Sequence, residues 1–254
     1  MYENICYKKP FLVEAVVRFD FASQIPEFEK GLPARVSTAA LKKFPIFEPQ
    51  KTQLHELQFG DAVEAKSSVT EIINLIYHGL EKEKTLNITP NSLDVTIKNY
   101  HTFELFMEDV LAPLSALCEA FPELRASRVG IRYVNVINLT GGNPLDWNDY
   151  VNPKLIGVID FHEKENLSRA FQMLEYNFEE DATKFQFGLV NPDYPAKIKR
   201  REFVLDIDAF SVGAFDYQGI LGKINKGHER IQELFESSIT QTTRENMKVV
   251  NNAG

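Results

Sequence analysis

The stretch ASRVGIRYVNVINL, residues 126–139, decides the fold, because the strand that it predicts carries apolar side chains on both faces. Ile131 and Tyr133 point to one face, whereas Val134 and Val136 point to the other. A strand that is apolar on both faces is typical of the middle of a sheet, where both faces are covered. We therefore expect a central strand with helices over one face, and with a cavity, a loop or a partner over the other.

The elements around this strand follow the same order twice along the chain, with an offset of roughly 115 residues. The first half predicts a strand at 11–21, a broken helix within 26–43, strands at 68–79, 84–89 and 93–99, and a helix at 102–121. The second half predicts the strand at 126–139, a short helix at 145–156, strands at 167–178, 183–190 and 201–210, and a helix at 216–237. Two interpretations stay open: an internal duplication with halves at 1–124 and 125–254, and one continuous domain.

Short turns between consecutive strands predict a mostly antiparallel sheet, because parallel neighbours need long crossover connections. The expected fold is α+β: a mostly antiparallel curved sheet with long helices packed on one face, in two β-α-β-β-β-α pseudo-repeats that resemble a helix-grip arrangement. We expect the binding site on the sheet face that the helices leave free. A small molecule, a peptide or a protein, including a second copy of the chain, would occupy that face.

The strand REFVLDIDAF, residues 201–210, places two carboxylates side by side. Its apolar residues alternate toward the helices, so Asp206 and Asp208 lie on the opposite face. Adjacent carboxylates repel each other unless a cation lies near them. Arg132 is the candidate, because it shares its face with the valines of a strand that we expect to be buried, and a buried arginine must be paired. The cluster is either a polar ligand site or an internal ion pair that fixes strand register, and we favour the ion pair.

His228 lies on the apolar stripe of the last long helix, in line with Ile224 and Ile231. A histidine on such a stripe is more often a hydrogen-bonded core residue than a base or a metal ligand. The two aspartates should lie across the sheet from it. We therefore do not combine His228 with Asp206 and Asp208 into a catalytic pair.

Composition excludes several classes of protein. The net charge of −8 opposes attraction to phosphate backbones, so nucleic acid is not the expected partner. Cys6 and Cys118 lack the spacing of a disulfide framework, and no apolar leader or run of about 18 apolar residues occurs, which favours a cytoplasmic protein without a membrane anchor. The sequence contains no phosphate-binding loop, Gly-x-Ser-x-Gly or His-Glu-x-x-His motif, and we assign no cofactor and no metal.

Four segments together resemble a sporadically distributed prokaryotic family of about this length that is defined by sequence rather than by an activity: PFLVEAVVRF (10–19), RVGIRYVN (128–135), FVLDIDAF (203–210) and HERIQELFESSITQTTRENM (228–247). The similarity covers nearly the whole chain and depends on the order and spacing of the segments. It implies signature positions here at Arg132, Tyr133, Asn135, Asp206, Asp208, His228 and Thr240. The patchy distribution of the family resembles that of accessory, mobile or defence-associated genes.

The function predicted from these observations is a non-enzymatic binding or protein-interaction module. Its polar cluster would be Arg132, Asn135, Asp206, Asp208 and His228, as a ligand site or as a structural element. Two alternatives stay open. A metal-dependent phosphodiesterase or nuclease would use Asp206 and Asp208 to hold Mg²⁺, and an RNA-binding protein would use the free sheet face.

Overall fold

A computed structural model describes the backbone of residues 5–59 and 65–250, and the side chains of the same ranges except 52–59, 65–72 and 250. One antiparallel sheet of ten strands dominates it, in the order β3-β5-β6-β7-β2-β8-β11-β10-β9, with β4 paired to β5 beside this path. Its strands are β2 (Leu12–Phe21), β3 (Ile46–Phe47), β4 (Gln50–Phe59), β5 (Ala65–His78), β6 (Lys84–Ile88), β7 (Ser92–Ile97), β8 (Ala126–Asn138), β9 (Ala170–Phe178), β10 (Asp181–Leu189) and β11 (Glu202–Phe215). Two short strands, β1 (Cys6–Tyr7) and β12 (Val249–Val250), pair separately near the two ends.

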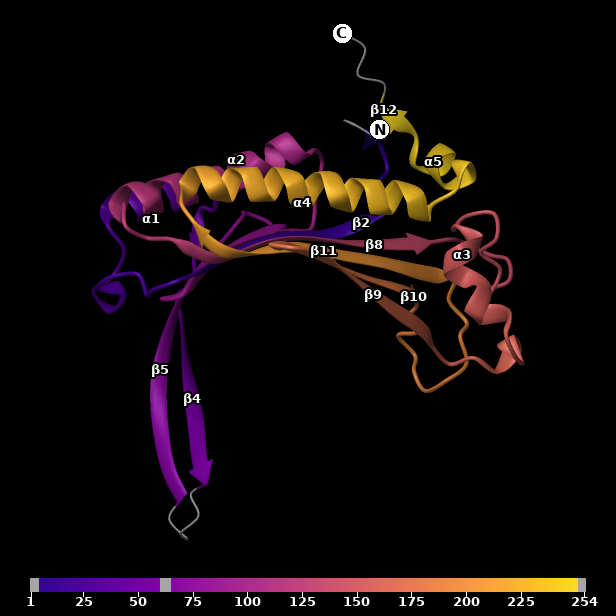
Figure 1. The fold of residues 1–254 in the computed structure, drawn as a ribbon, viewed down its shortest axis with the longest axis horizontal. Coiled ribbons are helices and arrows are strands. Elements are labelled where there is room, and N and C mark those ends of the chain that lie inside the picture. Colours follow the sequence, from indigo (N-terminus) through magenta and orange to yellow (C-terminus); the bar gives the residue numbers. More distant parts are fainter. Residues whose placement is uncertain (1–4, 60–64, 251–254) are drawn as a thin grey trace.

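The long helices lie together on one side of this sheet, as Figure 1 shows. The helices are α1 (Ala34–Lys43), α2 (Phe103–Ala120), α3 (Pro153–Ile156), α4 (Tyr217–Ser238) and α5 (Gln241–Met247), and short 3₁₀ helices lie at 28–30, 157–160 and 164–166. The α4 helix packs on β8 and β11. The β4–β5 hairpin projects from the sheet on the side away from the helices.

The predicted α+β class, the antiparallel sheet and the helices on one face are confirmed. The strand at 126–139 is central as predicted, because β8 pairs with β2 on one side and with β11 on the other. The short helix expected at 145–156 is wrong over most of its length: turns end at residue 150, Val151 forms an isolated bridge to Ile239, and only α3 is helical. Asn152 caps the start of α3 by accepting a hydrogen bond from the backbone N–H of Lys154, and Pro153 occupies the first helical position.

The two halves of the chain place equivalent strands symmetrically about the β2–β8 pair. Arg18 on β2 pairs with Asp94 on β7, and Arg132 on β8 pairs with Asp208 on β11, so both partners recur 114 residues later. The capping residues of α2 and α4, Thr102 and Asp216, are also 114 residues apart. One sheet runs through both halves in this two-fold register, and the duplication of the halves stays a prediction.

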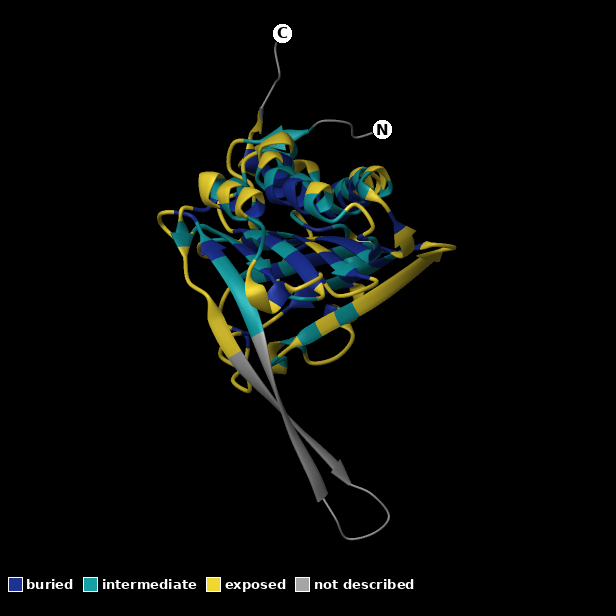
Figure 2. Cartoon of the chain, turned by 90° about the vertical axis from the view of Figure 1, so that its left-hand side faces the viewer, coloured by how far each residue is buried: buried dark blue, intermediate teal, exposed yellow. Residues whose placement is uncertain are grey.

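The core lies between the helices and the sheet, where Figure 2 shows the buried residues. Alternate residues of β11, such as Leu205 and Ile207, are fully buried beneath α4. A glycine in α4 allows the close approach: a Cβ on Gly227 would lie 2.6 Å from Cγ2 of Ile131 on β8. The helix therefore sits almost directly on the central strands. In the described part of the chain, no helix has the length and apolarity that crossing a membrane requires.

Candidate functional site

The predicted ion pair between Arg132 and Asp206 is present and bidentate. Arg132 donates from Nε to Oδ1 at 2.7 Å and from Nη2 to Oδ2 at 2.6 Å. Asp208 has a different partner, because Nη2 of Arg128 lies 3.4 Å from its Oδ2. Arg128 was missed, although it stands four residues before Arg132 and on the same face of β8. The two carboxylates are thus neutralised by two guanidiniums rather than by one.

The expectation that Arg132 is buried is wrong, because 44% of its side chain is exposed. The free face of the sheet is also not the apolar, screened surface that we expected. Ion pairs run across it, from Arg18 with Asp20 at 2.8 Å to Lys184 with Glu175 at 3.6 Å. The valines of β8 on this face are only partly buried, since no helix covers them.

Local burial and charge set the ionisation of this face. Burial raises the pKa of Asp208, which the nearby Arg128 and Arg132 partly offset. The hydrogen bonds that Arg132 donates to Asp206 raise the pKa of Arg132. Both oxygens of Asp206 already accept hydrogen bonds, and among the residues described here no group of three or more His, Cys, Asp or Glu is arranged to hold a metal ion.

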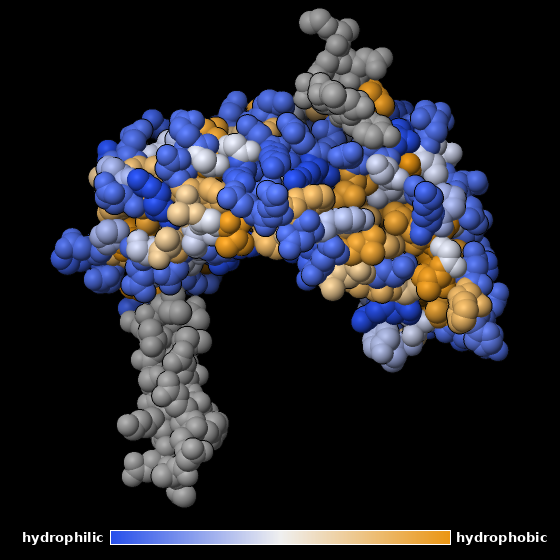
Figure 3. All heavy atoms as spheres, viewed as in Figure 1, coloured by the Kyte–Doolittle hydropathy of each residue, from blue (hydrophilic) through white to orange (hydrophobic). Residues whose placement is uncertain are grey.

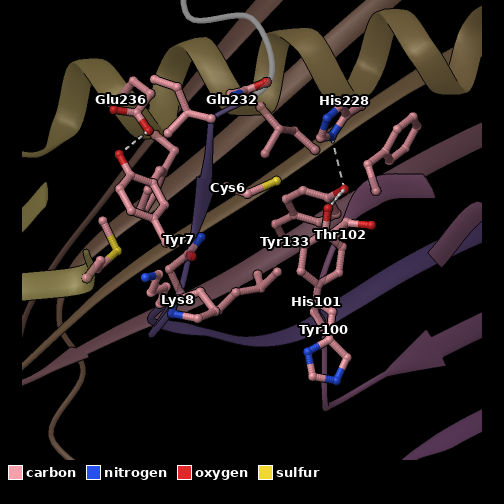
Figure 4. Close-up of a pocket in the computed structure, with 18 of the residues that line it drawn as sticks. Cys6, Tyr7, Lys8, Tyr100, His101, Thr102, Tyr133, His228, Gln232 and Glu236 are labelled. Carbon is pink, nitrogen blue, oxygen red and sulfur yellow. Dashed lines mark hydrogen bonds between the residues drawn. The ribbon is translucent and has the colours of Figure 1, made fainter. Parts of the chain in front are cut away.

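A cavity of about 470 Å³ lies on the other side of the sheet, between β8, α4, the start of α2 and the N-terminal segment. This placement differs from the expected binding site on the free face. Figure 4 shows His228 and Glu236 reaching the cavity from two positions along α4. Its walls are mainly aromatic and apolar, and include Tyr7, Leu12, Tyr100, Phe103, Tyr133, Ile231, Phe235 and Met247.

His228 joins the polar groups at one end of the cavity. Its Nδ1 lies 3.0 Å from the Tyr133 hydroxyl, which in turn lies 3.3 Å from the Tyr100 hydroxyl. The imidazole stacks on Phe103 with parallel rings 3.8 Å apart. Burial lowers the pKa of His228 to about 4, and the charge of Glu104 opposes this only in part. The imidazole is therefore neutral at pH 7.

Burial also keeps the neighbouring hydroxyls and the thiol protonated. It raises the pKa of Tyr100, Tyr133 and Cys6 above their ordinary values. Asn135 is buried beside them, with its Nδ2 donating to the backbone oxygen of Leu205 at 3.5 Å. This end of the cavity thus offers neutral hydrogen-bonding groups in an apolar setting.

The other end contains one buried and fully paired charge. Glu236 is 1% exposed, accepts a hydrogen bond from the Tyr7 hydroxyl at 2.6 Å and pairs with Nε of Arg244 at 2.8 Å. Burial, followed by the bond to Glu236, raises the pKa of Tyr7. These contacts fasten the N-terminal segment and α5 to α4, and so close one wall of the cavity.

The predicted polar residues therefore divide between the two sides of the sheet. Arg132, Asp206 and Asp208 lie on the free face, whereas Asn135 and His228 line the cavity. The N-terminal wall and Tyr100 were missed, because residues 5–8 show no periodicity that a pattern could reveal. A signal was present for Tyr133: it shares a strand face with Ile131, which the apolar pattern places under the helices.

No protein-family model matches the chain, so the family resemblance seen in the sequence stays a prediction. No curated protein matches it either. Among solved structures the chain is similar to Methanococcus jannaschii TBP, with 10% sequence identity and a TM-score of 0.26, over 89% of this chain and 99% of that chain. A similarity at this level says nothing about function.

Proposed function

We propose that this protein is a non-enzymatic binding module that takes a small, uncharged, partly aromatic ligand in the cavity beneath α4. The observation that carries the proposal is the cavity itself, about 470 Å³ with aromatic walls and a hydrogen-bonded His228–Tyr133–Tyr100 chain at one end. Small-molecule sites typically occupy about 300–1,000 Å³ and combine apolar walls with a few fixed polar groups. The cavity has both properties.

The buried groups of the lining favour an uncharged ligand, whereas its other charged side chains, Lys8 and Glu104, are exposed. His228 is neutral at pH 7, and the buried carboxylate of Glu236 is satisfied by Tyr7 and Arg244. A charged ligand would lose its hydration without gaining a buried counter-ion, which is costly. A neutral aromatic ligand avoids this cost and gains contact with Phe103 and the other rings.

The tyrosine chain defines the polar contact that the ligand would make. In our proposal Tyr100 donates to Tyr133, and Tyr133 donates to Nδ1 of His228, which places the imidazole proton on Nε2. No residue of the described chain hydrogen-bonds to Nε2. The ligand would therefore present a carbonyl or another neutral acceptor to Nε2–H.

Catalysis receives less support than binding. A histidine with a pKa of about 4 is a weak base at neutral pH, and a thiol whose pKa is raised by burial is a poor nucleophile. The phosphodiesterase alternative would have to displace Arg132 from both oxygens of Asp206. The RNA-binding alternative would use a free face on which acidic groups balance the basic ones, as Asp208 balances Arg128.

The unpaired cysteines favour the location in the cytoplasm that we propose.

Titration with Nile red, a neutral aromatic dye with a carbonyl acceptor, tests the proposal. Binding should raise the dye fluorescence in the wild type, and Gln232→Trp should abolish it, because Gln232 lines the cavity. Gln218→Trp is the matched control, since Gln218 is exposed on the same helix and outside the cavity. Equal binding by both variants, or no binding by the wild type, would refute the proposal.

The first half of the chain supplies a second test. The positions 114 residues before Tyr133 and His228 are Phe19 and Leu114, and both are fully buried apolar residues. The double variant Tyr133→Phe, His228→Leu copies this apolar pair into the second half. We expect it to fold and to bind Nile red at least ten-fold more weakly, because it loses the Nε2–H donor. Unchanged affinity in a folded double variant would contradict the assigned polar contact.

A further inference from the structure

Strand β9 is a free edge of the sheet, because it pairs with β10 alone. Five of its nine residues are exposed large apolar side chains: Phe171, Met173, Leu174, Tyr176 and Phe178. Figure 3 shows apolar side chains gathered at the end of the molecule where β9, β10 and α3 lie. Free edges in monomeric proteins are normally protected by charges, prolines or bulges, and long apolar edges associate with other strands.

These protective devices are scarce on β9. The strand contains no proline and pairs with β10 in continuous register without a bulge. Its single charge is Glu175, which already lies 3.6 Å from Lys184 of the same chain. The edge is therefore open to a further strand along its whole length.

The charges that flank β9 indicate what that further strand is. Arg169 stands immediately before the strand, and Glu179 stands immediately after it. Both are exposed, and neither forms an ion pair with any residue that the structure describes. Arg169 lies over the ring of Tyr194, 4.3 Å from its centroid, and Glu179 begins the turn between β9 and β10. An antiparallel copy of β9 would bring each arginine opposite the glutamate of the other copy, whereas a parallel copy would bring like charges together. The strand is thus complementary to itself in one direction only.

We propose that β9 pairs antiparallel with β9 of a second copy of this chain, about a two-fold axis at Leu174. In this register Leu174 faces its own counterpart, Gln172 faces Tyr176 of the second copy, and Arg169 faces Glu179 of the second copy at both ends. Each copy satisfies the free backbone groups of the other, which is the isologous contact of a closed dimer. The sheet then continues across the axis, and the exposed apolar side chains of one edge pack on those of the other.

Sedimentation equilibrium of the full chain tests the pairing. The wild type should dimerise with rising concentration, and Leu174→Lys should weaken dimerisation at least ten-fold, because it places two ammonium groups opposite each other on the axis. Leu41→Lys is the matched control, because Leu41 on α1 is 43% exposed and Leu174 is 42% exposed. A monomeric wild type, or equal dimerisation of the two variants, overturns the proposal.

A charge swap tests the antiparallel register. Arg169→Glu and Glu179→Arg, each alone, place like charges opposite each other twice per dimer and should weaken dimerisation about five-fold. An equimolar mixture of the two variants forms a heterodimer in which both contacts are again Glu with Arg, so association should return to within about two-fold of the wild type. If the mixture associates no better than the single variants, this pairing is refuted. Circular dichroism checks that each variant is folded.

Discussion

The buried imidazole of His228 should make the stability of this protein fall steeply in mild acid. Its pKa drops from 6.5 to about 4 on folding, because the ring is buried between Phe103 and the Tyr133 hydroxyl. Between these two pH values the unfolded chain binds a proton that the folded chain does not, so unfolding becomes easier as the pH falls. Each pKa unit corresponds to about 1.4 kcal/mol, so His228 alone should remove about 3 kcal/mol of stability between pH 7 and pH 4.

His228→Gln isolates this contribution, because glutamine can still accept a hydrogen bond from Tyr133 but does not titrate. Urea unfolding at several pH values between 7 and 4 gives the free energy of unfolding, and the single buried tryptophan, Trp147, reports it by fluorescence. The loss of stability from pH 7 to pH 4 should be about 3 kcal/mol smaller in the variant than in the wild type. His162→Gln, at a largely exposed histidine, should leave the wild-type pH dependence intact. A difference below about 1 kcal/mol between His228→Gln and the wild type would refute the reasoning.

Two further pairs of substitutions should change the free energy of unfolding by different amounts. One pair removes ion-paired arginines, and the other adds a methyl group at two glycines of α4. Arg132→Met should cost about 1–2 kcal/mol, because Arg132 is 44% exposed although its partner Asp206 is buried. Arg244→Met should cost about 3 kcal/mol, because Arg244 is less exposed and the carboxylate of Glu236 would lose its counter-ion while it is 1% exposed. Equal costs would contradict this ranking. Gly227→Ala should destabilise the protein by about 1–2 kcal/mol, because its methyl group would lie 2.6 Å from a buried side-chain atom of β8. Gly222→Ala should stabilise it by about 0.5–1 kcal/mol, because nothing lies within 4 Å of the added methyl group and alanine favours the helix. A stabilising Gly227→Ala would show that α4 can move away from the sheet.

The sequence predicted most strands of the sheet because their signals are local, although it did not predict β3 and β4. The alternation in β2 and β11 and the apolar stripe of α4 each depend on residues close together in the chain, so pattern and structure agree. The start of α2 has a local signal too, because the side chain of Thr102 accepts a hydrogen bond from the N–H of Leu105. Caps of this kind depend on a few neighbouring residues and can be predicted without knowledge of the tertiary fold.

The solvent exposure of the free face could not be predicted from residues close together in the chain. Val134 and Val136 indicated a covered surface, but a pattern cannot show whether another element covers them. Two valines that follow two ion-paired arginines on β8 are compatible with a solvent-exposed face, because Arg128 and Arg132 hold their carboxylates without being fully buried. The position of the cavity depended on tertiary contacts as well. Its outer wall is closed by Tyr7, which contacts Glu236, more than 200 residues away in the chain.

The two halves differ at two positions that contribute polar groups to the cavity beneath α4. The same strand and helix positions hold Phe19 and Leu114 in the first half and Tyr133 and His228 in the second. Since the first pair is fully buried and apolar, the scaffold itself does not require polar groups at this place. Burying polar groups where apolar ones suffice costs free energy unless they are hydrogen-bonded, as Tyr133 and His228 are to each other. In our proposal the tyrosine and histidine of the second half serve the recognition of a ligand, since the apolar pair of the first half indicates that the fold can form without them.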